Sequence, residues 1–210
     1  MTDSESSAAY RELTQFFANH SSATVLLRVG ALGYAAARCV LLNGMFEGLV
    51  LGAQAIEKTL KSYLLLNDPK RSVKALSHSL PRLLHETTTL FPHLPVQRFA
   101  PLVEKFRAYY QTRYPDNPDA AKDKTTGDVR GLDELIIFLS ENMPCPHHVR
   151  YRAGIYPLIT ASIDLGRSEI TSYERWIKYD NHALLPLLPR INSEHRAVMR
   201  ALYPGHPRYC

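Results

Sequence analysis

Four arginine–histidine pairs in this sequence have a spacing suited to acid–base chemistry on phosphate esters. A histidine can move a hydroxyl proton near neutral pH, and an arginine can stabilise charge developing on phosphate oxygens. Because the chain holds 17 arginines and 9 histidines, such pairs also arise by chance. Arg190 and His195 are the best placed, since polar residues separate them near an expected helix start; the alternative is a solvated basic helix. The pairs are Arg71 with His78, Arg175 with His182, Arg190 with His195, and Arg200 with His206.

A second group of candidate ligand-binding residues lies in the polar segment 113–128, which we expect to form a long loop. The guanidinium of Arg113 could bind a phosphate, with Tyr114 beside it. Alternatively, Arg113 and Asp116 form a buried pair or an Asx-type turn that holds the loop in place. The sequence leaves both interpretations open.

Three further residues, all in or before central helices, could also contact a ligand. His78 precedes an expected helix start at Ser79, where it either fixes the turn or contacts a ligand. Lys58 and Lys61 lie on one expected helix, where they either form a solvated face or contact phosphate. Glu57 stands four residues before Lys61, and we expect both on the side opposite the apolar stripe.

Metal and cofactor sites are not indicated. Cys145, His147 and His148 stand close together, but a zinc site would need a fourth ligand from a distant segment. Gly44, Gly48 and Gly52 lie within helical sequence and follow no strand, so they do not form a phosphate-binding loop. Instead, their spacing of four predicts close helix packing inside a bundle or at a dimer interface. We expect no metal and no cofactor.

The elements that must position these residues are helices. Apolar residues recur every three or four positions over 45–66, and the segment 31–42 is rich in alanine and leucine. Asn43-Gly44 between them predicts a tight turn and an antiparallel pair. The sequence predicts an all-α protein of six to eight helices. The other expected helices are 79–90, 96–111, 132–139, 172–185 and one capped by Asn192 or Ser193 that ends at 202, whereas 151–165 suits either helix or strand.

Four segments, in order over residues 31–141, resemble the HEPN domain family, in its branch with an Arg-Tyr-Pro-Asp turn. The stretch 53–65 is similar to the Ala-Gln-Ala-x-Glu-Lys-x-Leu-Lys pattern of the second HEPN helix. This resemblance implies an antiparallel HEPN-like helical bundle that often pairs as a homodimer. The four segments are 34–47, 53–65, 77–84 and 112–116.

The resemblance implies three kinds of role: metal-independent ribonucleases, partners of nucleotidyltransferases, and non-catalytic nucleotide- or RNA-binding modules. The ribonucleases carry an arginine, then four to six residues, then a histidine, and residues 114–119 after Arg113 contain no histidine. We therefore expect a nucleotide-, RNA- or partner-binding protein that is not catalytic by itself, acting with a nucleotidyltransferase or in a toxin–antitoxin or defence setting. The alternative is a ribonuclease that uses Arg190 and His195.

Charge divides the chain at about residue 145. The 210 residues have a net charge of +5, of which +1 falls in 1–145 and +4 in 146–210. We expect a HEPN-like bundle over 1–145 and a basic C-terminal helical extension over 146–210 packed on it. Arginines alternate with aromatics in this extension, which suits RNA binding or plain packing against the bundle. The three cysteines form no disulfide framework, and charged residues interrupt the apolar stretch 23–55, so we expect a cytoplasmic protein without a membrane span.

Overall fold

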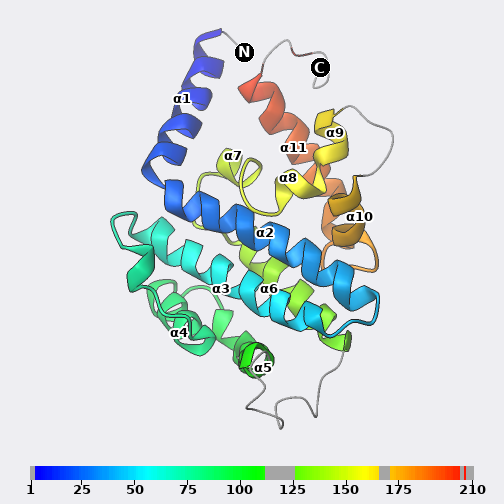
Figure 1. Cartoon of the computed structure of the whole chain (residues 1–210). Helices are drawn as coiled ribbons and strands as arrows, with labels where there is room; N and C mark the ends of the chain where they lie inside the picture. The colour runs from blue at the N-terminus through cyan, green and yellow to red at the C-terminus, as the bar shows by residue number, and fades with distance from the viewer. Residues whose placement is uncertain (1–2, 112–125, 166–170, 204–205, 207–210) are drawn as a thin grey trace.

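The protein is an α-helical bundle, which confirms the all-α prediction (Figure 1). The computed structural model describes residues 3–111, 126–165, 171–203 and 206. Within these residues the regular structure consists of α-helices and short 3₁₀ turns, without a strand. The α-helices are α1 (Asp3–Asn19), α2 (Ser21–Leu42), α3 (Glu47–Asn67), α4 (Leu80–Leu90), α5 (Ala100–Gln111), α6 (Val129–Glu141), α7 (His147–Arg150), α8 (Tyr156–Ile159), α9 (Ala161–Leu165), α10 (Ser172–Lys178) and α11 (Leu188–Leu202).

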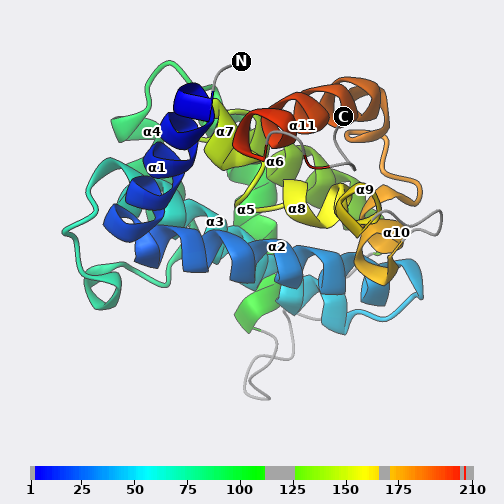
Figure 2. The same ribbon diagram turned by 90° about the horizontal axis from the view of Figure 1, so that it is seen from above.

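Helices α2 and α3 form the centre of the bundle as an antiparallel pair (Figures 1 and 2). The turn predicted at Asn43-Gly44 joins them, and Gly44 has a φ of +77°, which favours glycine. Gly48 lies where the two helices approach closely, because a Cβ there would stand 2.6 Å from Leu41 Cγ. Gly52 faces Phe106 of α5 in the same way. Two of the three glycines therefore pack inside the bundle, as one of the two interpretations predicted.

We expect Gly48→Ala to lower the free energy of unfolding by about 1–3 kcal/mol, because the new methyl group would overlap its neighbours. One of these neighbours is a backbone atom, Ala37 O at 2.8 Å, which cannot rotate away. Gly33→Ala on α2 is the matched control, since its Cβ would meet only ordinary contacts at 3.7 Å. This control should be neutral or stabilise by up to about 1 kcal/mol. Urea unfolding followed by circular dichroism measures both; equal effects would contradict the close approach at Gly48.

Helices α4 and α5 pack on α3 and on each other, so these three helices create the pocket discussed below. Pro81 lies in the first turn of α4, where a missing N–H costs nothing. The segment 91–95 ends this helix as predicted, and a 3₁₀ turn at Val96–Phe99 leads into α5. The predicted helix 96–111 is thus present with a tighter first turn.

The C-terminal part differs from the prediction in three places. Residues 151–165 contain the two short helices α8 and α9, so the strand alternative is wrong. Helix α10 ends at Lys178, seven residues earlier than expected. Helix α11 begins at Leu188, because Pro189 sits in its first turn and does not interrupt it; the expected cap at Asn192 or Ser193 is wrong.

Helix α1 was not predicted, although its sequence carries a signal. Ala9, Leu13, Phe16 and Phe17 recur at helical spacing and pack against the core. In the structure α1 contacts α2, α7 and α11, so it joins the beginning and end of the described chain.

One continuous hydrophobic core extends from Leu13 to Leu202, with residues from both sides of the predicted boundary at 145. A buried polar group also crosses this boundary. Arg38 of α2 forms an ion pair with Asp133 of α6, and its Nε donates to the carbonyl oxygen of Trp176 at 2.8 Å. The extension thus shares its core with the bundle, while the division into two parts stays a prediction.

Helix α2 is long and apolar enough, by length and composition, to cross a membrane. Core helices of soluble proteins satisfy the same criterion, so the expectation that the chain has no membrane span stays a prediction. In the fold, 44% of its most apolar window is buried against other helices, and Arg38 within it is paired. The cytoplasmic location stays a prediction.

Candidate ligand-binding site between α3, α4 and α5

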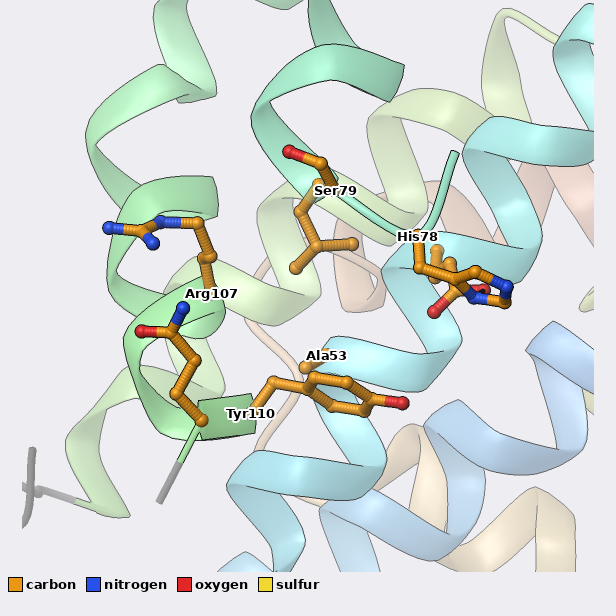
Figure 3. Close-up of a pocket in the computed structure, with 8 residues that line it drawn as sticks. Ala53, His78, Ser79, Arg107 and Tyr110 are labelled. Atoms are coloured by element: carbon orange, nitrogen blue, oxygen red, sulfur yellow. Dashed lines mark hydrogen bonds and ion pairs between the residues drawn. The ribbon is translucent and has the colours of Figure 1, made fainter. Parts of the chain in front are cut away.

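A pocket lies between α3, α4 and α5, and His78 is the residue predicted from the sequence that lines it (Figure 3). Its volume is about 180 Å³. This is smaller than the roughly 300–1,000 Å³ usual for sites that enclose a whole ligand, so it would hold only part of one. We call it the α3–α5 pocket. Its lining residues are Ala53, Glu57, His78, Ser79, Leu80, Arg107, Tyr110 and Gln111.

Glu57, Lys61 and His78 form a hydrogen-bonded group at one wall of this pocket. Glu57 Oε1 accepts from Lys61 Nζ at 2.9 Å and lies 3.0 Å from His78 Nδ1. The side chains of Glu57 and Lys61 are each only 5% exposed, whereas that of His78 is 79% exposed. The expectation that Glu57 and Lys61 lie on a solvated face is therefore wrong, because both are buried in contact with each other and with His78.

This geometry changes what each residue can do. Lys61 is held by Glu57, and turning it toward a phosphate would leave that buried carboxylate without its lysine partner. His78 keeps an exposed ring whose Nδ1 is oriented by Glu57, so its other nitrogen can contact a ligand. Lys58, one turn earlier on α3, is half-buried and does not line the pocket.

Arg107 and Tyr110, both on α5, form the opposite wall. Tyr110 points across Ala53 toward His78, whereas the guanidinium of Arg107 points outward at the rim (Figure 3). Arg107 Nε donates to Glu104 Oε1 at 2.7 Å in an ion pair whose side chains are 41% and 52% exposed. Exposed pairs contribute about 0–1 kcal/mol, so a phosphate could compete for this guanidinium.

Neither Arg107 nor Tyr110 was predicted as a site residue from the sequence. No local pattern marks them as site residues, because their relation to His78 depends on how three helices pack. The predicted site residues Arg113, Tyr114 and Asp116 lie outside the described residues. Gln111, which lines the pocket, is the last described residue before them.

Arg190 and His195 do not form a shared exposed site. His195 is completely buried, with Nε2 2.7 Å from Asp164 Oδ1 and its ring beside Tyr151. Arg190 is partly exposed and donates to the carboxylates of Glu141 and Glu194. In this conformation the imidazole cannot reach a substrate, and the arginine is already neutralised.

Glu194 is the centre of a polar cluster that attaches α11 to the segment following α6. It accepts from the Tyr151 hydroxyl at 2.5 Å and from Arg190 at 3.0 Å, and lies 3.3 Å from His147. Burial alone would raise the pKa of Glu194, but the hydrogen bonds from Tyr151 and His147 and the charge of Arg190 outweigh it. The pKa of this carboxyl therefore lies below its usual value of 4.5.

A carboxyl with a lowered native pKa stabilises the fold above its unfolded pKa, and this contribution is lost as the pH falls through the native value. We therefore expect wild-type protein to lose stability more steeply below pH 4.5 than Glu194→Gln does. Melting temperatures of both proteins between pH 3 and pH 7 measure the difference. Parallel curves would contradict the lowered pKa.

The C-terminal basic and aromatic residues are divided between interior and surface. Tyr151 and Tyr156 are buried, and their rings stack with centroids 5.0 Å apart. Tyr173 and Tyr179 remain half or more exposed, with Arg175 exposed between them. The packing interpretation therefore holds for Tyr151 and Tyr156. Of these four tyrosines, a surface for RNA could include only Tyr173 and Tyr179.

The cluster around Cys145 makes protein contacts. His147 lies near Glu194, and His148 Nε2 is 3.9 Å from Glu12 Oε2. Burial raises the pKa of the Cys145 thiol to about 11, which disfavours the thiolate that zinc binds. In the described part of the chain, no group of three or more His, Cys, Asp or Glu side chains is arranged to hold a metal ion.

Comparison of the chain with known protein families, with curated proteins and with solved structures gave no match. The HEPN resemblance thus rests on the four sequence segments alone and stays a prediction.

Proposed function

We propose that this protein is a HEPN-like nucleotide-binding protein that is not catalytic by itself. The observation that supports the proposal is the α3–α5 pocket, which combines an aromatic ring, an oriented imidazole and a guanidinium at its rim. Aromatic rings stack on bases, and guanidinium groups bind phosphates. The pocket is also lined by His78, which the sequence singles out, and Lys61 forms an ion pair with its lining residue Glu57.

In this proposal the base lies against Tyr110 inside the pocket, and the phosphate lies at the rim beside Arg107. The volume of about 180 Å³ suits a base, with ribose and phosphate outside. Lys61 neutralises Glu57, so that carboxylate does not oppose an anionic ligand. Because Nδ1 of His78 donates to the Glu57 carboxylate, the other nitrogen of the neutral imidazole can accept a hydrogen bond from the base or ribose.

Thermal-shift and calorimetric titrations with AMP, ATP and a short single-stranded RNA test the proposal. We expect a nucleotide to raise the melting temperature of wild-type protein. Tyr110→Leu should weaken binding about tenfold or more, since stacking contributes about 1–3 kcal/mol per base. Arg82→Gln, an exposed arginine on α4 that does not line the pocket, is the control for Arg107→Gln. Absence of any nucleotide response would refute the proposal, and a response to RNA alone would favour RNA as the ligand.

The competing proposal is a metal-independent ribonuclease that uses Arg190 and His195. It predicts growth arrest on expression that His195→Ala relieves. Because His195 is buried against Asp164, it does not act as an active-site group, and we expect His195→Ala not to relieve growth arrest by removing one. Relief by His195→Ala of a variant that still folds, checked by circular dichroism, would instead support the ribonuclease.

Pairing as a homodimer and association with a nucleotidyltransferase remain separate proposals from the HEPN resemblance. Analytical ultracentrifugation of the full chain tests the first. Co-purification with the product of a neighbouring nucleotidyltransferase gene tests the second, as well as a toxin–antitoxin or defence setting.

A further inference from the structure

A second pocket lies on the other side of α2 from α3, between α1, α2 and the segment that joins α7 to α8. Its volume is about 400 Å³, which is within the usual range for a small-molecule site. In Figures 1 and 2, α1 and the α7–α8 segment lie on the same side of α2. We call it the α1–α2 pocket. Its lining residues are Phe17, Thr24, Val25, Arg28, Arg152, Ala153, Gly154, Pro157 and Leu158.

The α1–α2 pocket combines an apolar surface with two arginines and no carboxylate among its described lining residues. Arg28 comes from α2, and Arg152 comes from the turn after α7, so two separate elements direct positive charge to one pocket. The guanidinium of Arg152 lies over the Tyr203 ring, with Cζ 5.9 Å from the centroid. This contact orients the side chain, and no described residue accepts a hydrogen bond from its guanidinium.

Several other arginines of this protein are neutralised by carboxylates. Arg38 pairs with Asp133, Arg71 with Glu86, and Arg190 with two carboxylates. Arg28 and Arg152, in contrast, make no ion pair with any described residue. A planar guanidinium binds a carboxylate through two parallel hydrogen bonds, so two guanidinium groups at one pocket, neither paired with a described carboxylate, favour an anionic group there.

The rest of the pocket favours hydrocarbon. It is lined by the apolar residues Phe17, Val25 and Leu158, and Val25 is 60% exposed. Thr24 is its sole neutral polar side chain among the described lining residues, and its hydroxyl already donates to the Ser21 carbonyl oxygen at 2.9 Å. A nucleobase, which needs several polar partners at its edge, would therefore be poorly recognised here.

We infer that the α1–α2 pocket binds an amphipathic carboxylate, a fatty-acid-like anion whose chain covers Val25 and Leu158 and whose carboxylate contacts Arg28 and Arg152. This site is separate from the α3–α5 pocket and does not depend on nucleotide binding. Binding would remove apolar surface from water and give the two guanidinium groups a carboxylate acceptor.

Calorimetric titration of the full chain with dodecanoate, below the concentration at which it forms micelles, tests the inference. Dodecanol and dodecyltrimethylammonium serve as matched probes with a neutral and a positive head group. We expect dodecanoate to bind at one site per chain and both matched probes to bind at least about tenfold more weakly, because hydrogen bonds to charged groups contribute most of the selectivity. Equal binding of the three amphiphiles, or no binding of dodecanoate, would overturn the inference.

Variants locate the site. Arg28→Gln and Arg152→Gln should each weaken dodecanoate binding at least about tenfold while leaving dodecanol binding unchanged. Arg175→Gln, an exposed arginine on α10 that does not line the pocket, is the control and should bind like wild type. Wild-type affinity in both pocket variants would overturn the assignment. Because these arginines are exposed, the variants should keep the wild-type melting temperature, which separates a lost site from a lost fold.

Discussion

Replacing Arg38 by methionine should lower the free energy of unfolding by about 3–5 kcal/mol, the largest effect that we expect from one substitution at a polar residue. Arg38 is completely buried, and its partner Asp133 is 2% exposed. Burial raises the pKa of Asp133 even though Arg38 and Tyr34 act against this, which shows how strongly the site disfavours an unpaired carboxylate. Without Arg38 that carboxylate has only the Tyr34 hydroxyl as a donor among the contacts seen here. Urea unfolding followed by circular dichroism measures the loss.

Two comparisons separate the ion pair from general loss of packing. Arg82→Gln removes an exposed partner of Glu86 and should change stability by less than about 1 kcal/mol. The double variant Arg38→Met with Asp133→Leu should be more stable than Arg38→Met alone, because it removes the uncompensated charge. If Arg38→Met unfolds within 1 kcal/mol of wild type, the buried pair does not hold α2, α6 and the end of α10 together.

The second large effect is expected at the wall of the α3–α5 pocket. Lys61→Met keeps most of the side-chain volume but leaves the buried Glu57 with His78 as its remaining partner. We expect a loss of about 3 kcal/mol in the free energy of unfolding, again because a single charge stays buried. Equilibrium unfolding in urea at pH 7 measures it.

Lys58→Met is the matched control for this prediction, since both lysines lie on α3 within one turn. Lys58 is half-buried and takes part in no ion pair with a described residue. Its replacement should stay within about 0.5 kcal/mol of wild type, as is usual for substitutions away from special contacts. Equal losses in the two variants would contradict the assignment of Lys61 as a structural partner of Glu57.

The central helices could be predicted because their signals are local. Helical spacing over 45–66, the turn at Asn43-Gly44 and the proline start of α4 each act within a few residues. Where the prediction was wrong, a local signal had two meanings. A proline such as Pro189 can end a helix or stand in its first turn. Here it stands in the first turn of α11, which packs against α1.

The contacts of the candidate site were harder to predict, because they depend on how separate helices pack. Glu57 and Lys61 stand at a spacing typical of a solvated ion pair, yet both are buried beside His78, which precedes α4. The pairing of Arg38 with Asp133 joins residues 95 positions apart, which no sequence spacing reveals. His78 could be singled out from the sequence, whereas Arg107 and Tyr110 meet it only through the packing of α3, α4 and α5.

The central claim is that a nucleotide binds in the α3–α5 pocket. Amide chemical shifts of the full-length protein, recorded by two-dimensional NMR during titration with AMP, test it most directly. We predict saturable shifts concentrated at Ala53, Glu57, His78, Arg107 and Tyr110, which disappear in Tyr110→Leu. Shifts concentrated instead on α11 around Arg196 and Arg200, or no shifts at millimolar AMP, would contradict the claim.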